Sequence, residues 1–356
     1  MNLSKLQKEI VESKENKIVV MSAAASGKTA VLTERVRFLL RSGVKPEAMA
    51  VITFTNLAAE EMRSRLAEDF KPGLFIGTIH SLANSFVRAY GIDTSDAIEQ
   101  EKFERLFELV EENPGCVRHY DWVLLDEAQD SDVDQFSFIF GMINPPNFFV
   151  VGDPRQNIYQ FNDGDSKYML TLARQDGVKR ISLNENYRNG DEILSFARRL
   201  IRPTGIIDDS ITKVSGGKVF EKRLSVDSLI TGFKKMSNYG DWAILGRSND
   251  RVNSIIKQLT DAGIPCDGFK QGGLTRQELK EKMEANTVKV LTIHSAKGLE
   301  WDNVVVMDTR IGRNEEDRFL AYVAATRAKK KLYWNAEPPQ WDKPRKKRNE
   351  WAEEWN

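Results

Sequence analysis

An apolar run that leads into a loop of small residues decides how the chain is interpreted: residues 18–29 read IVVMSAAASGKT. Four apolar residues in a row indicate a buried strand, and the loop closes on Gly27, Lys28 and Thr29. A tight turn above a helix N-terminus, followed by a lysine and a hydroxyl, suits phosphate and Mg²⁺. Ser22 stands where the usual phosphate-loop pattern has its first glycine. We predict a nucleotide-phosphate site built from Ala25, Ser26, Gly27, Lys28 and Thr29, and an ordinary strand–turn–helix is the alternative.

A second apolar run, residues 122–125, carries two carboxylates at its carboxyl end, Asp126 and Glu127. Nucleotide hydrolysis needs one carboxylate near the metal ion and another that orients and deprotonates water. We therefore assign Asp126, together with Thr29, to Mg²⁺ and Glu127 to the water. The alternative is an acidic helix start, which the helix dipole also favours.

Composition narrows the class of protein. The 356 residues include 52 Lys+Arg and 52 Asp+Glu, so the formal net charge is zero and nucleic-acid binding would need a local basic groove. Two cysteines and three histidines do not form a disulfide scaffold or a zinc motif. The start has no apolar signal-peptide core, and no apolar run approaches the ~20 residues that span a bilayer. We expect a cytoplasmic protein without membrane contact.

Apolar strands alternate with amphipathic helices along the chain, which predicts an α/β protein with two doubly wound parallel sheets. Residues 1–185 form the first predicted domain, and residues 91–119 within it are a small acidic, helical insert. Residues 186–335 form the second, with a short stub at 271–287. Residues 336–356 are a tail with a basic run flanked by tryptophans.

Two arginines in the second predicted domain, Arg188 and Arg327, complete the candidate site. A phosphoryl group that gains charge in the transition state is stabilised by guanidinium groups, worth ~10³–10⁵ in rate. These arginines lie on the other domain from Lys28, so we predict a nucleotide held in a cleft between the two domains. A surface salt bridge is the alternative for any single arginine.

Beyond these features, the chain resembles the UvrD/PcrA/Rep helicases of superfamily 1, up to about residue 334. The resemblance rests on nine segments that occur in the order of that family's motifs: 6–7, 25–29, 51–62, 77–81, 126–130, 151–159, 186–188, 292–300 and 322–328. It implies two RecA-like domains of the P-loop NTPase class.

The resemblance also implies a role for individual residues. Gln7 would read adenine, Tyr187 would stack on it, and Glu300 would hold the ribose. Gln156 would sense the γ-phosphate, with Arg188 and Arg327 as fingers. The positions that match strand-contacting residues of the family are Phe54, Asn56, His80, Tyr159, Phe161 and His294. An aromatic such as Phe161 suits stacking on bases, but packing in the core is the alternative for Phe161 and both histidines.

Some positions depart from the family pattern. Ala30 follows Thr29 where relatives usually carry an arginine that helps hold the base, and Asn162 replaces a frequent arginine. The family inserts an accessory domain into each motor domain, whereas here only 91–119 and 271–287 stand at those places. The resemblance therefore predicts a minimal translocase.

The predicted function is an ATP-dependent translocase or helicase on single-stranded DNA that uses ATP and Mg²⁺. It would act in DNA repair or replication as a monomeric motor, and the resemblance alone implies 3′→5′ movement. A different class of function is an ATP-dependent sensor that closes on a strand and recruits a protein partner through the tail at 336–356. RNA as the strand is a third alternative, because stacking and phosphate contacts barely distinguish the sugars.

Overall fold

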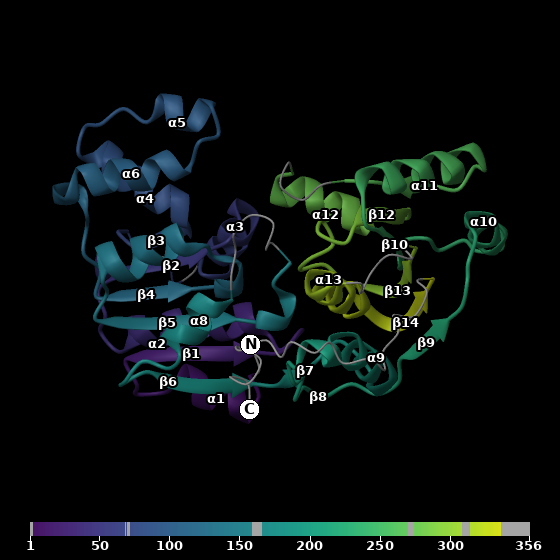
Figure 1. Ribbon diagram of the computed structural model, residues 1–356, viewed down its shortest axis with the longest axis horizontal. Helices are drawn as coiled ribbons and strands as arrows, with labels where there is room; N and C mark the ends of the chain where they lie inside the picture. The colour runs from purple at the N-terminus through teal and green to yellow at the C-terminus, as the bar shows by residue number, and fades with distance from the viewer. Residues whose placement is uncertain are drawn as a thin grey trace. The chain divides into compact units, whose positions relative to one another are not determined.

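The computed structural model is an α/β protein and describes residues 3–67, 69, 72–158, 166–269, 274–307 and 314–335 (Figure 1). The chain divides into two compact units, each with its own six-stranded sheet. Unit 1 comprises Met1–Ser22, Gly27–Pro154 and Tyr159–Leu183, and unit 2 comprises Ala23–Ser26, Arg155–Ile158 and Asn184–Asn356. The last change of unit falls between Leu183 and Asn184, close to the predicted boundary at 185. The predicted tail at 336–356 lies outside the described residues.

The sheet of unit 1 has the strand order β3-β2-β4-β5-β1-β6, with every pairing parallel. Its strands are β1 (Lys17–Ser22), β2 (Met49–Thr53), β3 (Phe75–Thr78), β4 (Trp122–Leu125), β5 (Asn147–Gly152) and β6 (Lys179–Leu183). The central strands are buried on both faces, because Val19 and Val20 on β1 are both fully buried although their side chains point to opposite sides. The parallel sheet predicted from the continuous apolar runs is confirmed.

Helices cover both faces of this sheet. They are α1 (Lys5–Val11), α2 (Lys28–Arg41), α3 (Asn56–Arg65), α4 (Ile79–Ala89), α5 (Ser95–Glu99), α6 (Glu104–Glu112), α7 (Val133–Phe136) and α8 (Lys167–Leu172), with a π-helical turn η4 (Ser137–Ile143) after α7. The first helix begins at a capping box, in which Ser4 and Gln7 satisfy each other's backbone N–H groups. The predicted insert at 91–119 contains α5 and α6, which lie beside α4 in Figure 1.

Unit 2 repeats the architecture with the strand order β11-β12-β10-β13-β14-β9, again parallel throughout. Its strands are β9 (Lys218–Glu221), β10 (Trp242–Gly246), β11 (Cys266–Asp267), β12 (Val288–Thr292), β13 (Trp301–Val306) and β14 (Ala328–Trp334), and β7 (Glu185–Asn186) pairs separately with β8 (Ile211–Thr212). The predicted fold class, a mixed α/β protein with parallel sheets, is therefore confirmed in both units.

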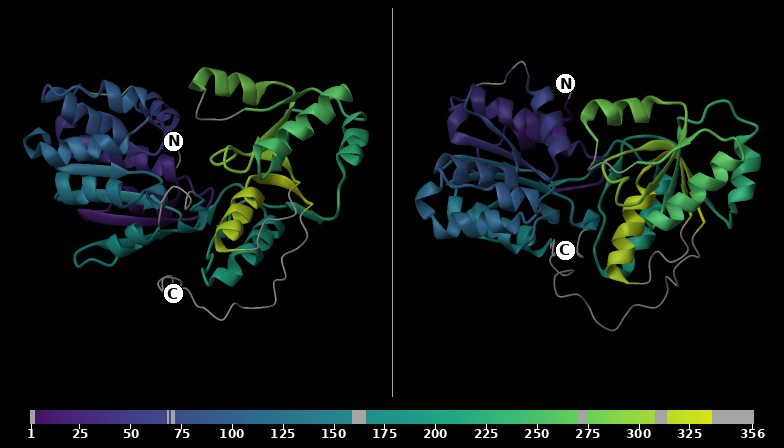
Figure 2. Two further views of the ribbon diagram at one scale, coloured as in Figure 1. Left: turned by 45° about the horizontal axis from the view of Figure 1, so that its top comes forward. Right: turned by 90° about the horizontal axis from the view of Figure 1, so that it is seen from above.

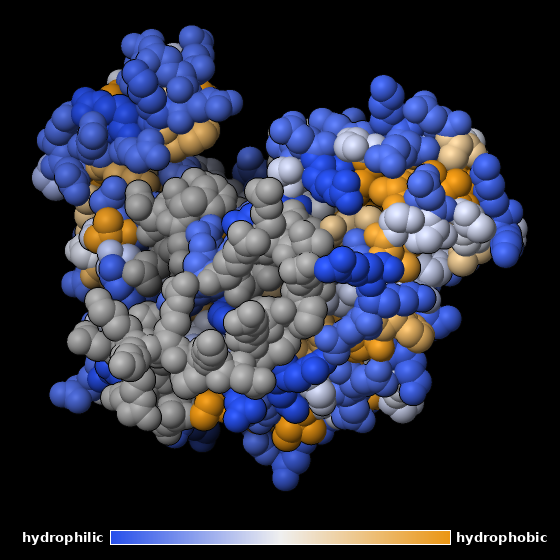
Figure 3. All heavy atoms as spheres, turned by 45° about the vertical axis from the view of Figure 1, so that its right-hand side comes forward, coloured by the Kyte–Doolittle hydropathy of each residue, from blue (hydrophilic) through white to orange (hydrophobic). Residues whose placement is uncertain are grey.

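The helices of unit 2 are α9 (Asp191–Ile201), α10 (Val226–Phe233), α11 (Asn249–Asp261), α12 (Arg276–Glu284) and α13 (Glu315–Ala325). Apolar residues of α10 and α11, such as Phe233 and Ile255, share a core with Val290 and Val305 of the sheet. The pair α9 and α13 lies on the other face (Figure 2). Hydrophilic side chains dominate the coloured surface in Figure 3, and the apolar ones form small patches. Among the described residues, no helix is long and apolar enough to cross a membrane.

Substitution of Gly190, the N-cap of α9, tests how tightly unit 2 is packed. A Cβ at this position would lie 1.8 Å from the carbonyl oxygen of Gly216, which is backbone and cannot rotate away. We expect Gly190→Ala to lower the free energy of unfolding by about 3 kcal/mol, at the upper end of overpacking effects. Gly232→Ala in α10 is the matched control, because nothing lies within 4 Å of its Cβ. That change should stabilise the helix by about 0.5–1 kcal/mol. Urea unfolding of unit 2 measures the change in unfolding free energy for both variants. Equal urea midpoints for Gly190→Ala and Gly232→Ala would contradict this packing.

Candidate nucleotide-hydrolysis site

The loop between β1 and α2 ends in a left-handed turn at Gly27, directly before the helix. Gly27, the N-cap of α2, has φ 81°, and a Cβ there would lie 2.8 Å from Nε2 of Gln7. The left-handed backbone favours glycine, and a larger residue would also have to displace the end of the Gln7 side chain. The hydroxyl of Ser22 donates to the carbonyl of Gly152 at 2.8 Å, which joins the ends of β1 and β5. The serine that breaks the expected glycine pattern thus has a structural use.

The lysine, the hydroxyl and the two carboxylates predicted from separate motifs meet in unit 1. Lys28 Nζ lies 3.1 Å from Oε1 and 3.2 Å from Oε2 of Glu127, and Thr29 Oγ1 lies 3.5 Å from Oδ2 of Asp126. The strands β1 and β4 that carry them are separated only by β5. Parallel strands end at one edge of the sheet, so these side chains converge there.

The electrostatics of this edge fit a divalent cation. Burial and the nearby Glu127 carboxylate raise the pKa of Asp126 to about 7, with Lys28 acting in the opposite direction. Burial alone would lower the pKa of Lys28, but Glu127, Asp153 and Asp126 together raise it. Within the described ranges, no group of three or more His, Cys, Asp or Glu side chains could hold a metal by itself. Mg²⁺ is commonly held by one or two carboxylates plus substrate phosphates, so the donor set agrees with it.

Gln129, which the sequence argument did not single out, orients Glu127. Its Nε2 donates to Oε2 of Glu127 at 2.6 Å, and its Oε1 accepts the backbone N–H of Asp153 at 2.9 Å. The side chain is fully buried. Glu127 itself has φ 52°, a conformation that costs energy outside glycine and is typical of functional positions. The signal in the sequence was its place in the segment 126–130, one of the nine that resemble the family's motifs.

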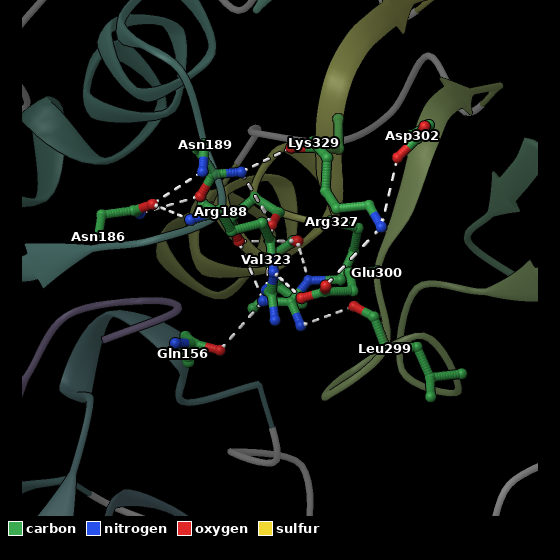
Figure 4. A network of polar contacts seen from close by, with 12 residues as sticks. Gln156, Asn186, Arg188, Asn189, Leu299, Glu300, Asp302, Val323, Arg327 and Lys329 are labelled. Atoms are coloured by element: carbon green, nitrogen blue, oxygen red, sulfur yellow. Dashed lines mark hydrogen bonds and ion pairs between the residues drawn. The ribbon is translucent and has the colours of Figure 1, made fainter. Parts of the chain in front are cut away.

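The remaining predicted nucleotide residues gather in unit 2, as Figure 4 shows. Arg327 is 1 % exposed, and its guanidinium donates to the carbonyls of Val323 and Leu299 and, at 3.3 Å, to Oε1 of Gln156. Arg188 Nε donates to Oε2 of Glu300 at 2.5 Å. The γ-phosphate sensor, both arginines and the ribose residue predicted from the resemblance therefore lie together.

Two short segments of the predicted first domain, residues 23–26 and 155–158, form hydrogen bonds with residues of unit 2. The backbone N–H of Tyr187 donates to the carbonyl of Ala25 at 3.1 Å, and the ring of Tyr187 is exposed. Lys297 Nζ donates to the carbonyl of Gln156 at 3.0 Å. Ala25 and Gln156 belong to the segments 23–26 and 155–158, which group with unit 2 although the predicted first domain contains them. The cleft between the two domains stays a prediction.

The predicted strand-contacting residues are spread over both units. Phe54 and Asn56 flank the start of α3, where Asn56 is exposed. The ring of His80 lies 5.3 Å from those of Phe103 and Phe107, and burial lowers its pKa. Burial also lowers the pKa of His294 in unit 2. Tyr159 and Phe161 lie outside the described residues.

Two models of one protein family match most of the chain. The model of the UvrD/REP helicase N-terminal domain matches residues 3–115 and 105–176, and that of the UvrD-like helicase C-terminal domain matches residues 269–336. The chain belongs to the UvrD-like helicase family. The first match holds the phosphate loop, both carboxylates and Gln156, and the second holds Glu300 and Arg327. Arg188 lies between the two matches.

Curated relatives within the UvrD-like helicases are distant in sequence. DNA helicase II of Escherichia coli K12 is 24 % identical, over 94 % of this chain and 60 % of the relative. A putative ATP-dependent DNA helicase R568 of Acanthamoeba polyphaga mimivirus is 25 % identical, over 91 % and 51 %. ATP-dependent DNA helicase PcrA of Staphylococcus epidermidis is 24 % identical, over 74 % and 50 %. The chain spans about half the length of the relatives it matches.

Proposed function

We propose that this protein hydrolyses ATP to move along single-stranded DNA, with 3′→5′ polarity taken from the family resemblance. One observation carries the proposal: Lys28 contacts Glu127 while Thr29 contacts Asp126 at a single edge of the sheet. A phosphate-binding lysine, a hydroxyl beside a carboxylate and a second carboxylate form the minimum set for metal-assisted hydrolysis. Two of the relatives are named as ATP-dependent DNA helicases, which supports this choice of substrate.

Each residue of the edge has a role that its surroundings support. Thr29 Oγ1 and Asp126 would hold Mg²⁺, which when bound neutralises part of the charge on the phosphate oxygens. Lys28 would bind the β- and γ-phosphates and exchange its contact with Glu127 for them. Glu127, oriented by Gln129, would then accept a proton from the attacking water.

The nucleotide base would be bound by residues near the same loop. The amide of Gln7 lies against Gly27, so it can donate to or accept from the ring of adenine. Tyr187 would stack on the base, and Glu300 would accept from the ribose hydroxyls. Because Glu300 now accepts from Arg188, binding of the ribose would release that arginine for the phosphates.

Arg327 and Gln156 would respond to the γ-phosphate together, since each is the other's hydrogen-bond partner. A γ-phosphate that attracts Arg327 would move both groups, and its loss on hydrolysis would return them. Such a ligand-dependent change between two states of two domains is a common way to turn hydrolysis into motion.

The strand would be held by sequence-independent contacts from Phe54, Asn56, His80, Tyr159, Phe161 and His294. A neutral imidazole stacks and hydrogen-bonds without depending on charge, which agrees with the lowered pKa of His80 and His294. Recognition through stacking tolerates any base, as a moving protein requires.

The deciding experiment compares ATP turnover without a strand, with single-stranded DNA and with single-stranded RNA, alongside unwinding of 3′- and 5′-tailed duplexes. We expect turnover to rise at least tenfold with DNA and less with RNA, and the 3′-tailed duplex to be preferred. Tight ATP-dependent strand binding without turnover would instead identify a sensor. Equal stimulation of ATP turnover by RNA and by DNA would contradict the proposal that DNA is the preferred strand.

A further inference from the structure

Arg327 occupies an unusual place in the chain. Helix α13 ends at Ala325 and β14 begins at Ala328, so only the C-cap Thr326 and Arg327 connect them. The last carbonyls of a helix have no partner inside the helix and must be bonded from elsewhere. What bonds the carbonyls of Thr326 and Ala328 therefore determines where the backbone of Arg327 lies.

The side chain of Asn189 bonds both of these carbonyls, as Figure 4 shows in part. Its Nδ2 donates to Thr326 O at 3.1 Å and to Ala328 O at 2.7 Å, which uses both hydrogens of the amide. The intervening carbonyl of Arg327 accepts from the backbone N–H of Trp301 at 3.1 Å. Three successive carbonyls centred on Arg327 are thus fixed by two residues.

Asn189 is itself held from several directions. Its Oδ1 accepts from Asn186 Nδ2 at 3.0 Å, its backbone N–H donates to Asn186 Oδ1 at 2.8 Å, and its carbonyl accepts from Thr212 at 2.7 Å. The residue is fully buried. Only a nitrogen can face two carbonyl oxygens, so the orientation of the amide is determined by its partners.

The carbonyl of Thr326 also accepts a hydrogen bond from the second arginine, Arg188. Arg188 Nη1 donates to Thr326 O at 3.2 Å, next to the bond from Asn189, and the backbone N–H of Arg188 donates to Asn186. We infer that Asn189 is a positioning residue that holds Arg188 and Arg327 as one unit. The inference deepens the proposed function, because it concerns the arginines assigned to ATP hydrolysis.

The hydrogen bonds of Asn189 indicate how much ATP hydrolysis should slow when its side chain is removed. Loss of the amide would remove the side-chain bond to the buried carbonyl of Ala328 and one of the two side-chain bonds to that of Thr326. The backbone at Arg327 would then shift to compensate. A displacement of about 1 Å in a positioned group can cost 10²-fold in rate. We therefore expect Asn189→Ala to lower kcat for strand-stimulated ATP hydrolysis by about 10²-fold, while KM for ATP changes less than about threefold.

The test combines activity with a readout that needs no turnover. Asn184→Ala, the same substitution at a partly exposed residue nearby, is the matched control. The backbone N–H of Trp301 donates to the carbonyl of Arg327, so its hydrogen exchange reports how well the backbone at Arg327 is held. This exchange should speed up by about tenfold in Asn189→Ala and stay unchanged in the control. Asn189→Asp should behave like Asn189→Ala, because a carboxylate cannot donate to the two carbonyls.

Non-additivity separates positioning from general destabilisation. In an Arg188→Ala/Arg327→Ala background, Asn189→Ala should lower kcat no further than about twofold, since it acts through these two arginines. An undiminished additional loss in that background, or unchanged exchange at Trp301, would overturn the inference. Wild-type protein without strand-stimulated turnover would refute the proposed function, and the exchange result would then decide the role of Asn189 alone.

Discussion

Arg327→Ala is expected to lower the rate of ATP turnover by about 10³–10⁵-fold, the range found when a guanidinium that stabilises phosphoryl transfer is removed. The side chain is 1 % exposed and already bonded to Gln156, so it cannot be replaced by a mobile neighbour or by water. ATP affinity should fall far less, because Lys28 and Thr29 belong to the other unit. Single-turnover hydrolysis with labelled ATP measures the rate directly.

Arg199→Ala is the matched control for this prediction. Arg199 belongs to the same unit and forms an exposed ion pair with Glu221 at 2.5 Å. An exposed pair contributes about 1 kcal/mol or less, so the control should hydrolyse ATP at the wild-type rate. Unfolding of unit 2 should be followed in both variants. If Arg327→Ala retained more than a tenth of the wild-type rate while folded, the assignment of this arginine would fail.

Glu127→Gln should slow hydrolysis by about 10²–10⁴-fold and leave ATP bound, because an amide has the shape of the carboxylate but takes no proton from water. Gln129 and Lys28 surround this position, so the replacement keeps its space and most of its contacts. Equilibrium binding of a fluorescent ATP analogue and single-turnover hydrolysis separate the two effects. The variant should therefore bind the nucleotide and hold it unhydrolysed.

Lys28→Ala should affect ATP binding, in contrast to Glu127→Gln, which should affect hydrolysis alone. It removes the cation that faces Glu127, so three carboxylates, those of Asp126, Glu127 and Asp153, would stand near the phosphates without it. We expect ATP binding itself to be lost. Glu127→Gln with full turnover, or Lys28→Ala with normal affinity, would each remove the corresponding residue from the proposed mechanism.

The predicted strands were reliable for a physical reason. Continuous apolar runs such as Ile18–Met21 are stable as strands when both faces are covered, which a parallel sheet with helices on each side provides. Since such strands all end at one edge, the meeting of Lys28 with Glu127 followed from the two motifs. The separation of 99 residues between them made no difference to that argument.

Other features of the site could not be predicted in this way. The role of Gln129 depends on where the backbone of Asp153 lies, and nothing local indicates that distance. The sequence boundary at 185 likewise gave no sign that residues 155–158 group with the second unit. The contact of Gln129 joins a side chain to a distant backbone group, which no periodicity in the sequence describes.

By itself, the sequence determined the strands, the phosphate turn and the residue types available for chemistry, because periodicity, glycine and capping act over a few neighbouring residues. Only the tertiary structure decided which groups bond to one another over long separations. Asn189 and Thr326 are 137 residues apart, and Arg327 and Gln156 are 171 apart. Such partners are selected by the shape of a packed core, where most buried polar atoms find a partner nearby.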